Sequence, residues 1–171
     1  MSGLMQRALI IGSPGAGKST LSHALAARTE LPLYHMDKIH WLPGWIERDR
    51  DEALAEVKQV LAKDRWIIDG NYGSTLPIRI KRADTVVWLD YPTWRCLGRV
   101  LKRWWQHRGQ TRPDMTEGCP ERLDLEFLRY VLMFRSGWHR RNGQILAGFT
   151  GQVIRFQHPR EAEQWLDGLS I

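Results

Sequence analysis

Apolar runs alternate with amphipathic stretches along most of the chain, and this alternation is the first guide to its fold. Most of the short runs are apolar at every position, which is typical of strands buried on both faces. We expect five such strands, at about residues 6–11, 33–36, 66–68, 85–89 and 153–156. Strands that alternate with helices predict a parallel sheet with helices on both faces, an α/β fold.

The intervening stretches have the spacing of helices with one apolar face. We expect helices at about residues 18–28, after a cap at Asp49 or Asp51, at 93–107, from about 121 to a stop near Gly143, and from Pro159 onward. The longest of them carries an apolar stripe made of Leu123, Phe127, Val131, Phe134 and Trp138. Residues 74–81 are ambiguous, whereas 38–45 and 108–120 are expected to be loops.

The loop after the first strand fits the phosphate-loop pattern G-x-x-x-x-G-K-[ST], from Gly12 to Ser19. A strand before this motif and a helix after it are the context that the motif requires. Glycines let backbone N–H groups close around phosphate oxygens, and the helix adds its positive N-terminal end. We therefore predict that a nucleoside triphosphate binds the loop residues Gly12, Ser13, Pro14, Gly15, Ala16, Gly17, Lys18, Ser19 and Thr20.

Two side chains of this loop have more specific predicted roles. Lys18 can reach the outer phosphates as a positive charge, and the hydroxyl of Ser19 can ligate Mg²⁺. ATP with Mg²⁺ is the expected cofactor pair. Together with the order of the elements, the motif predicts a three-layer P-loop NTPase fold whose ligands lie beyond the carboxyl ends of the strands.

Aspartates follow three of the expected strands, at this ligand-binding edge. Asp69 is expected to orient Mg²⁺ through water; the alternative is a turn aspartate that bonds the backbone of Gly70 or Asn71. Asp37 is expected to hold or deprotonate an acceptor hydroxyl, with a helix or turn cap as an equal alternative. Asp90 is expected to cap the helix that follows it.

The phosphoryl acceptor is expected between Asp37, the loop that carries Trp41 and Trp45, and the turn that carries Asn71 and Tyr72. The two tryptophans can stack on a flat ring, or they can anchor their loop in the core, and the sequence leaves both readings open.

The net charge of +6 is concentrated in one segment. Residues 95–141 contain 11 Lys or Arg and 5 Asp or Glu, whereas the rest of the chain is balanced. Such a segment can clamp a triphosphate or contact a nucleic-acid backbone. Arg99 and Arg103 share one face of a helix. We predict that they act catalytically by neutralising the transferred phosphoryl group, under a mobile lid around residues 104–122.

The remaining composition narrows the setting. No apolar run is long enough to span a membrane and no signal-peptide pattern is found, so we expect a cytoplasmic protein without a membrane partner. Cys96 and Cys119 form no metal or redox motif. The histidines His35, His40 and His107 lack metal-ligand spacing, so no catalytic role is predicted for them. Without repeats or linkers, one domain over residues 1–171 is expected, and the oligomeric state stays open.

These motifs resemble those of the P-loop kinases of the adenylate kinase group, and most of all the bacterial DNA topology modulation proteins. The resemblance covers nearly the whole chain. It is carried by the phosphate loop, by Asp37 in His35-Met36-Asp37, by Asp69 in Trp66-Ile67-Ile68-Asp69-Gly70-Asn71-Tyr72, and by Arg99 with Arg103. It implies a five-stranded parallel sheet, ATP with Mg²⁺ and an arginine-rich helical lid. The arginine that holds the monophosphate of adenylate kinases, in Asp-Gly-Phe-Pro-Arg, is missing after Asp69, so the resemblance does not imply AMP as the acceptor.

Two functions are therefore predicted. The first is an ATP-dependent kinase for a small acceptor such as a nucleotide or nucleoside. The alternative is a nucleic-acid-binding protein with a regulatory or residual ATP site, which the localised positive charge motivates. The sequence carries no helix-turn-helix, zinc-finger or RNA-recognition signature, and no Asn-Lys-x-Asp motif that would indicate a GTPase switch.

Overall fold

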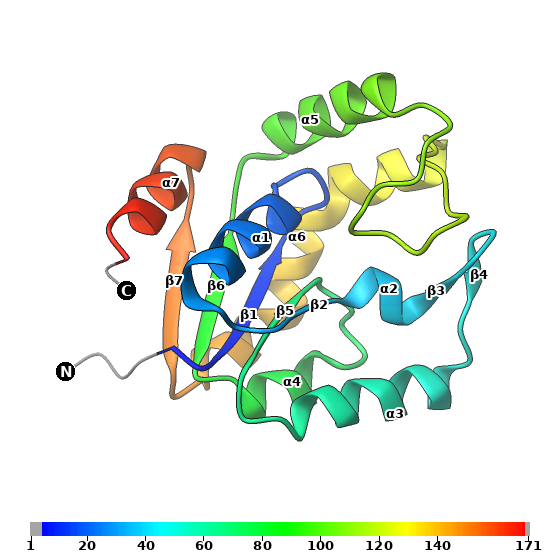
Figure 1. The fold of residues 1–171 in the computed structure, drawn as a ribbon. Coiled ribbons are helices and arrows are strands. Elements are labelled where there is room, and N and C mark those ends of the chain that lie inside the picture. The colour runs from blue at the N-terminus through cyan, green and yellow to red at the C-terminus, as the bar shows by residue number, and fades with distance from the viewer. Residues whose placement is uncertain (1–4, 170–171) are drawn as a thin grey trace.

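A computed structural model describes residues 5–169 of the chain. Its centre is a sheet of five parallel strands in the order β2-β5-β1-β6-β7 (Figure 1). The strands are β1 (Arg7–Gly12), β2 (Leu33–His35), β5 (Trp66–Asp69), β6 (Thr85–Leu89) and β7 (Gln152–Phe156). The predicted parallel sheet is confirmed, and each strand lies within one residue of its predicted bounds.

Helices cover both faces of this sheet. One face carries α1 (Lys18–Thr29) and α7 (Pro159–Asp167), and the other carries α3 (Arg50–Leu61), α4 (Leu76–Arg82) and α6 (Leu125–Ala147). Alternate residues of β1 serve the two sides: Ala8 and Ile10 pack in the first core, and Leu9 and Ile11 in the second. All four are completely buried, as expected for a central strand between two helical layers. This arrangement is the three-layer fold of the P-loop NTPases.

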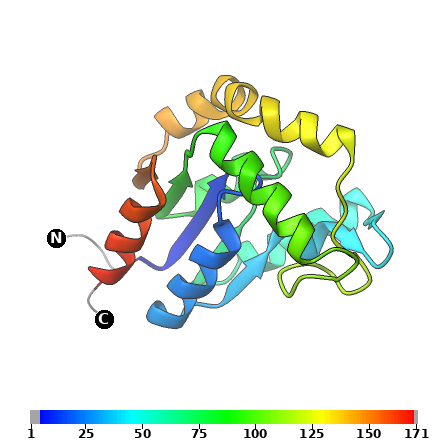
Figure 2. The same cartoon turned by 90° about the horizontal axis from the view of Figure 1, so that it is seen from above.

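The basic helix α5 (Thr93–Gln106) crosses the carboxyl edge of the sheet above the phosphate loop (Figure 2). Cys96 and Val100 attach it to the core. Residues 107–124, which we call the lid segment, connect α5 to α6 through turns and isolated bridges. In both ribbon views (Figures 1 and 2) this segment extends from α5 toward residues 41–47.

The predicted stop of the longest helix at Gly143 is wrong. Helix α6 begins at Leu125, where the Asp124 side chain caps it by accepting from the Phe127 N–H (2.7 Å), and it continues to Ala147. The buried face that contains most of the predicted stripe extends one turn further through Leu146, so packing holds Gly143 in the helix.

Two other stretches are more ordered than expected. Residues 36–47, predicted largely as a loop, form α2 (Met36–His40) and a hairpin of β3 (Trp41–Leu42) and β4 (Ile46–Glu47). These elements are too short to produce a periodic pattern, and Met36 and Ile39 anchor them by burial. The ambiguous stretch 74–81 forms most of helix α4, which ends at Arg82 and has Pro77 in its first turn. Among residues 5–169 no helix is long and apolar enough to span a membrane.

Candidate active site

The phosphate loop turns tightly between β1 and α1, at the carboxyl edge of the sheet. Gly15 and Gly17 have φ angles of +79° and +93°, which glycine adopts without strain. Gly17 is the N-cap of α1, and it offers no side chain to the first N–H groups of that helix. Because the helix is not capped by its own N-cap residue, these donors point toward the cleft as an anion site.

Lys18 bends back over this loop. Its Nζ donates to the carbonyl oxygens of Gly12 (2.9 Å) and Ser13 (3.1 Å). Burial lowers the pKa of Lys18, and the nearby carboxylates of Asp37 and Asp69 oppose this shift. Both carbonyl partners are neutral, and contact of the ammonium group with an outer phosphate stays a prediction.

Asn71 fastens the turn after β5 to the phosphate loop. Its Oδ1 accepts from the Gly12 N–H (3.0 Å), and its Nδ2 donates to the Gly12 carbonyl oxygen (2.7 Å). Both ends of the amide are therefore used on the loop backbone. Asn71 also lines the cleft, and the acceptor contact that the sequence suggests for it stays a prediction.

Asp69, at the end of β5, lies below the phosphate loop. Its Oδ2 accepts from the Ser22 hydroxyl of α1 (2.9 Å), and its Oδ1 is bonded to Nδ1 of His35 (3.0 Å). All three side chains are buried. Ser22 lies one turn beyond Ser19 on the same face of α1, so Asp69 is beside the predicted metal ligand. The sequence analysis missed His35, whose only signal was its place at the end of a strand.

Asp37 and Tyr72 face each other on the opposite wall of the site. The Tyr72 hydroxyl donates to Oδ1 of Asp37 at 2.5 Å, and its ring lies 4.7 Å from that of His40. Burial raises the pKa of Tyr72, and the charge of Asp37 raises it further, so the tyrosine stays protonated and remains a donor. These contacts hold the Asp37 carboxylate at the mouth of the cleft.

A buried arginine that the sequence did not single out supports the turn that carries Tyr72. Arg79 of α4 is fully buried, and its guanidinium donates to the carbonyl oxygens of Gly70 (2.9 Å), Asn71 and Tyr72 (2.9 Å) and to the Thr75 hydroxyl (3.1 Å). Burial lowers the pKa of Arg79 to about 10, which still leaves it charged at neutral pH. It is a structural cation that fixes the geometry between β5 and α4.

The hairpin β3–β4 and the lid segment are joined across the cleft. Trp41 and Trp45 lie edge to face with their ring centroids 5.4 Å apart, and Arg122 lies over the ring of Trp45 (4.7 Å). Four hydrogen bonds connect the two segments: Thr116 to the Trp41 oxygen (2.6 Å), Cys119 to the Leu42 oxygen (3.2 Å), the Gly44 N–H to the Gly118 oxygen (3.0 Å), and the Trp45 indole to the Pro120 oxygen (3.1 Å).

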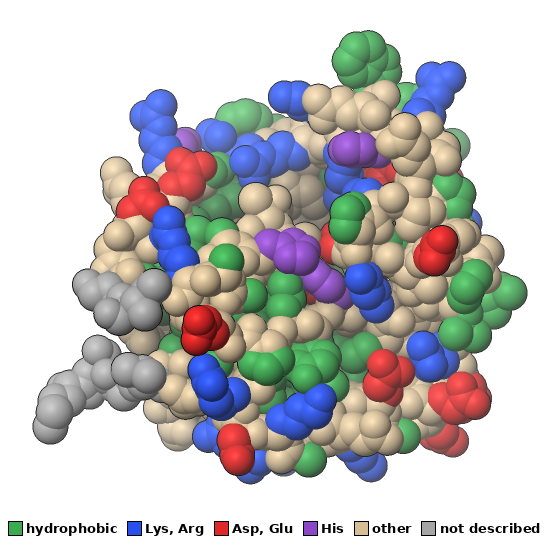
Figure 3. Space-filling view, viewed as in Figure 1, with side chains coloured by type: hydrophobic (Ala, Val, Ile, Leu, Met, Phe, Trp, Pro, Cys, Tyr) green, Lys and Arg blue, Asp and Glu red, His purple; other side chains and the backbone are tan. Residues whose placement is uncertain are grey.

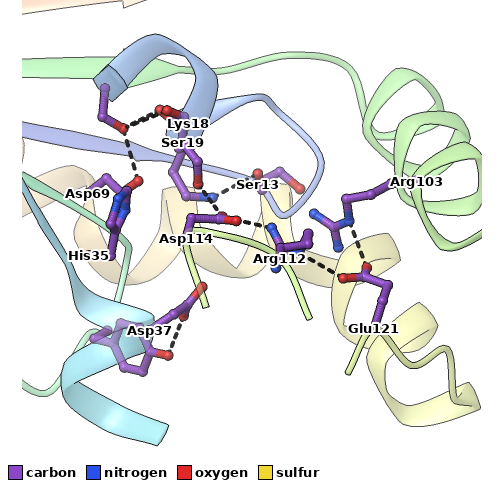
Figure 4. Close-up of polar contacts among 12 residues, drawn as sticks. Ser13, Lys18, Ser19, His35, Asp37, Asp69, Arg103, Arg112, Asp114 and Glu121 are labelled. Carbon is purple, nitrogen blue, oxygen red and sulfur yellow. Dashed lines mark hydrogen bonds and ion pairs between the residues drawn. The ribbon is translucent and has the colours of Figure 1, made fainter. Parts of the chain in front are cut away.

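A chain of polar contacts runs from the phosphate loop through the lid segment to α5 (Figure 4). The Ser19 hydroxyl donates to Oδ2 of Asp114 (2.6 Å), which also accepts from Arg112 (2.8 Å). Arg112 donates in turn to Oε2 of Glu121 (2.7 Å), whose Oε1 accepts from Arg103 (2.7 Å). Burial and the charge of Arg112 lower the pKa of Arg103, and Glu121 opposes them.

The second predicted arginine contacts the phosphate loop directly. Arg99 Nη1 donates to the Ala16 carbonyl oxygen at 3.1 Å, and it lies against Gly17. The structure thus brings Arg99 and Arg103 to the same side of the cleft, both reaching down from α5. The exposed Thr20 lies at the outer rim of the loop and also lines the cleft.

The predicted site residues, apart from Gly12 and Ser13, line one open cleft with a volume of about 1800 Å³, whereas the buried His35 and Arg79 lie outside its lining. The space-filling view shows a hollow below α5 with Lys and Arg side chains around it (Figure 3). The cleft lining includes the phosphate loop, Asp37, Tyr72, both tryptophans of the hairpin, Arg99 and Arg103. The predicted nucleotide site and the predicted acceptor site therefore open into the same space.

The predicted capping role of Asp90 is wrong. Helix α5 begins after Pro92, with no side-chain cap. Asp90 is instead buried between β6, β7 and α6, where it accepts from Arg135 (3.0 Å), His139 (3.0 Å) and Arg155 (2.9 Å). Burial raises the pKa of Asp90, but the three hydrogen bonds outweigh this effect and lower it.

Comparison with known proteins identifies the fold. No family model and no curated protein matches the sequence. Among solved structures, a shikimate kinase from Acinetobacter baumannii has a TM-score of 0.57 at 16% identity, over 96% of this chain and 92% of that one. The chain has the fold of the P-loop kinases. A shikimate kinase from Bacteroides thetaiotaomicron (TM-score 0.55, 15% identity, 95% of both chains) and a deoxyadenosine kinase from M. mycoides (0.53, 13%, 94% of both chains) are also similar.

Proposed function

We propose that this protein is an ATP-dependent phosphotransferase that moves the γ-phosphate of ATP to a small acceptor, such as a nucleotide or nucleoside. The observation that carries the proposal is that the phosphate loop and the Asp37 carboxylate line the same cleft, with arginines of α5 beside them. The cleft volume of about 1800 Å³ exceeds the roughly 300–1000 Å³ of a typical single-ligand pocket. This volume includes a groove along α1 and α7 that Arg28 and Asp167 line, and the two substrates would occupy the part between the phosphate loop and the hairpin.

On the nucleotide side, the backbone N–H groups of the phosphate loop and the start of α1 would bind the phosphate oxygens. Lys18 would leave its two carbonyl partners and pair with the outer phosphates. The hydroxyl of Ser19 and the nearby carboxylate of Asp69 fit a magnesium site, because Mg²⁺ takes oxygen ligands and commonly retains waters. When bound, Mg²⁺ neutralises phosphate charge and aligns the phosphates for transfer.

On the acceptor side, Asp37 would accept the proton of the attacking hydroxyl. The hydrogen bond from Tyr72 engages Oδ1 of Asp37 and orients the carboxylate, so that Oδ2 is the oxygen for the acceptor. Trp41 and Trp45 lie on the same wall of the cleft, where an aromatic face can stack on a flat ring. This supports an acceptor with a base or another planar ring.

Arg99 and Arg103 would neutralise the charge that spreads over the transferred group. Both reach the phosphate loop or the lid network from one face of α5. The bonds between the lid segment and the hairpin support water exclusion during transfer. The resemblance to the DNA topology modulation proteins concerns the same residues and adds no acceptor identity.

The nucleic-acid hypothesis finds less support. Several arginines of the basic segment are engaged inside the molecule, because Arg99 contacts the phosphate loop and Arg103, Arg112 and Arg135 pair with carboxylates. The carboxylates neutralise three of these charges, which leaves less positive charge for a nucleic-acid backbone. Titration of DNA or RNA at two ionic strengths is the check, because phosphate-backbone binding weakens steeply with salt.

The direct test uses labelled ATP with Mg²⁺ and a panel of nucleosides, nucleotides and other small hydroxyl compounds. We expect transfer to at least one acceptor. Asp37→Asn should then reduce kcat by about 10²–10⁴-fold, the usual contribution of a general base, with ATP affinity nearly unchanged. The exposed Asp64→Asn is the matched control. Tight ATP binding without transfer to any acceptor would contradict the proposed activity.

A further inference from the structure

Asp114 of the lid segment accepts a hydrogen bond from the Ser19 hydroxyl, which is the predicted metal ligand of the phosphate loop. Asp114 Oδ2 lies 2.6 Å from Ser19 Oγ, although the two residues are 95 positions apart in the sequence. Asp114 is only 8% exposed. Arg112 holds the same oxygen at 2.8 Å and is itself fixed by Glu121 (Figure 4). Two donors, one from the phosphate loop and one from the lid segment, therefore position this carboxylate.

The spacing of the two oxygens is close to that of neighbouring ligands on one Mg²⁺ ion. With Mg–O distances of about 2.1 Å, adjacent corners of an octahedron are roughly 3 Å apart. Ser19 Oγ and Asp114 Oδ2, 2.6 Å apart, need to separate by only a few tenths of an ångström to accept an ion between them. Mg²⁺ bound to a nucleotide commonly takes one or two protein carboxylates, so a second acidic ligand is chemically reasonable.

The hydrogen-bond partners of Asp114 support such a role. Ser19 and Arg112 both donate to its Oδ2, so this oxygen already acts as an acceptor at the position that a metal ligand would need. Asp69, by contrast, has one oxygen bonded to Ser22 and the other to His35. It is therefore better placed to act on the ion through water than to bind it directly.

We propose that Asp114 is a direct ligand of the Mg²⁺ that accompanies the bound nucleotide, delivered by the lid segment. The inference rests on the proposed function. Ser19 and Asp114 would then hold the ion in place of their mutual hydrogen bond, and Arg112 would keep the carboxylate oriented. The lid thereby detects the metal–nucleotide complex, because the same carboxylate would repel a triphosphate that arrives without Mg²⁺.

The test measures binding of an ATP analogue with a non-hydrolysable β,γ-imido bridge, by calorimetry, in excess EDTA and in saturating Mg²⁺. Wild type should bind more tightly with Mg²⁺. Asp114→Asn should weaken the Mg²⁺ complex by about 10- to 100-fold, the usual loss for a disturbed metal site, and should leave binding in EDTA unchanged or tighter. Glu117→Gln is the control, because Glu117 is an exposed acid of the same segment.

A second readout reports on the ion itself. With Mn²⁺ in place of Mg²⁺, loss of a protein ligand lets another water bind the ion, so water-proton relaxation by the Mn²⁺–nucleotide complex should increase in Asp114→Asn and not in Glu117→Gln. Equal weakening with and without Mg²⁺ would overturn the inference in favour of a structural role. Tighter binding under both conditions would overturn it in favour of a carboxylate that only blocks the site.

The two proposals fail separately in this experiment. A wild-type protein that binds no nucleotide in either buffer overturns the proposed function and the metal role with it. A wild type that binds with the expected help from Mg²⁺, next to an Asp114→Asn variant with the same response, overturns the metal role alone.

Discussion

Replacing Gly15 with alanine tests how closely α5 packs on the phosphate loop. A β-carbon on Gly15 would lie 2.4 Å from the Cys96 carbonyl oxygen and 2.8 Å from a Val100 methyl group. Backbone cannot move aside as easily as the end of a flexible side chain, so either the loop or α5 must shift. Gly44 supplies a matched control, because it has nearly the same φ (+82° against +79°) and nothing within 4 Å of its β-carbon position.

The two variants separate backbone strain from packing. A non-glycine residue in the left-handed region costs about 1–2 kcal/mol, and both variants should lose this much in free energy of unfolding. Gly15→Ala should lose about 1–3 kcal/mol more, the usual cost of overpacking a close contact. For a chain of 171 residues, each kcal/mol corresponds to a fall in Tm of about 2–4 °C.

Urea denaturation measures the loss in free energy of unfolding of both variants, provided that their m-values are equal. Nucleotide binding measures whether the phosphate loop keeps its geometry. We expect Gly15→Ala to bind ATP much more weakly, because the shifted phosphate loop no longer directs its backbone N–H groups at the phosphates. Gly44→Ala should bind ATP as the wild type does. Equal destabilisation of the two variants would refute the close contact between the loop and α5, and so would unimpaired ATP binding in Gly15→Ala.

Three further predictions follow from contacts elsewhere in the molecule. Arg103→Ala should lower kcat more than ATP affinity, since its charge is needed most in the transition state; equal losses in calorimetry and kinetics would argue against this role. Arg79→Met should lower the free energy of unfolding by about 3 kcal/mol or more, because several buried carbonyls lose a charged donor, and a urea titration that finds less than 1 kcal/mol would contradict the support assigned to it. Asp90 has a lowered pKa, so it stabilises the fold above about pH 3.9 and this contribution disappears as the pH falls through the lowered value. Asp90→Asn should therefore lower the free energy of unfolding at neutral pH and make it fall less steeply below about pH 4. If the variant and the wild type lost stability equally steeply in acid, the ion cluster around Asp90 would not contribute to stability.

The parts of the fold that the sequence predicted depend on local signals. A strand such as Thr85–Leu89 is apolar at nearly every position, and the phosphate loop needs glycines and a lysine within a single turn. Short elements were not predicted because a two-residue strand such as Trp41–Leu42 is too short to show a repeating pattern of apolar residues. The predicted end of the long helix at Gly143 was wrong because burial of Leu146 stabilises one further turn. The local signal of the glycine was weaker than this packing.

Candidate site residues were predictable where they lie in one motif, directly after a strand, or four positions apart on a basic helix, as Arg99 and Arg103 do. Asp114 reaches Ser19 over 95 positions, and Arg155 reaches Asp90 over 65. Nothing in the neighbouring sequence indicates such partners, because tertiary structure alone brings them together. Arg79 was missed because arginine is rarely buried completely. The backbone carbonyl oxygens that accept its hydrogen bonds have no sequence signature.

The bonds between the hairpin and the lid segment also bear on how products leave. Four hydrogen bonds tie residues 41–45 to residues 116–120, each worth about 0.5–1.5 kcal/mol. Together these bonds stabilise the contact between the hairpin and the lid segment. For the proposed kinase we therefore expect substitutions that weaken this contact to change the rate of product release.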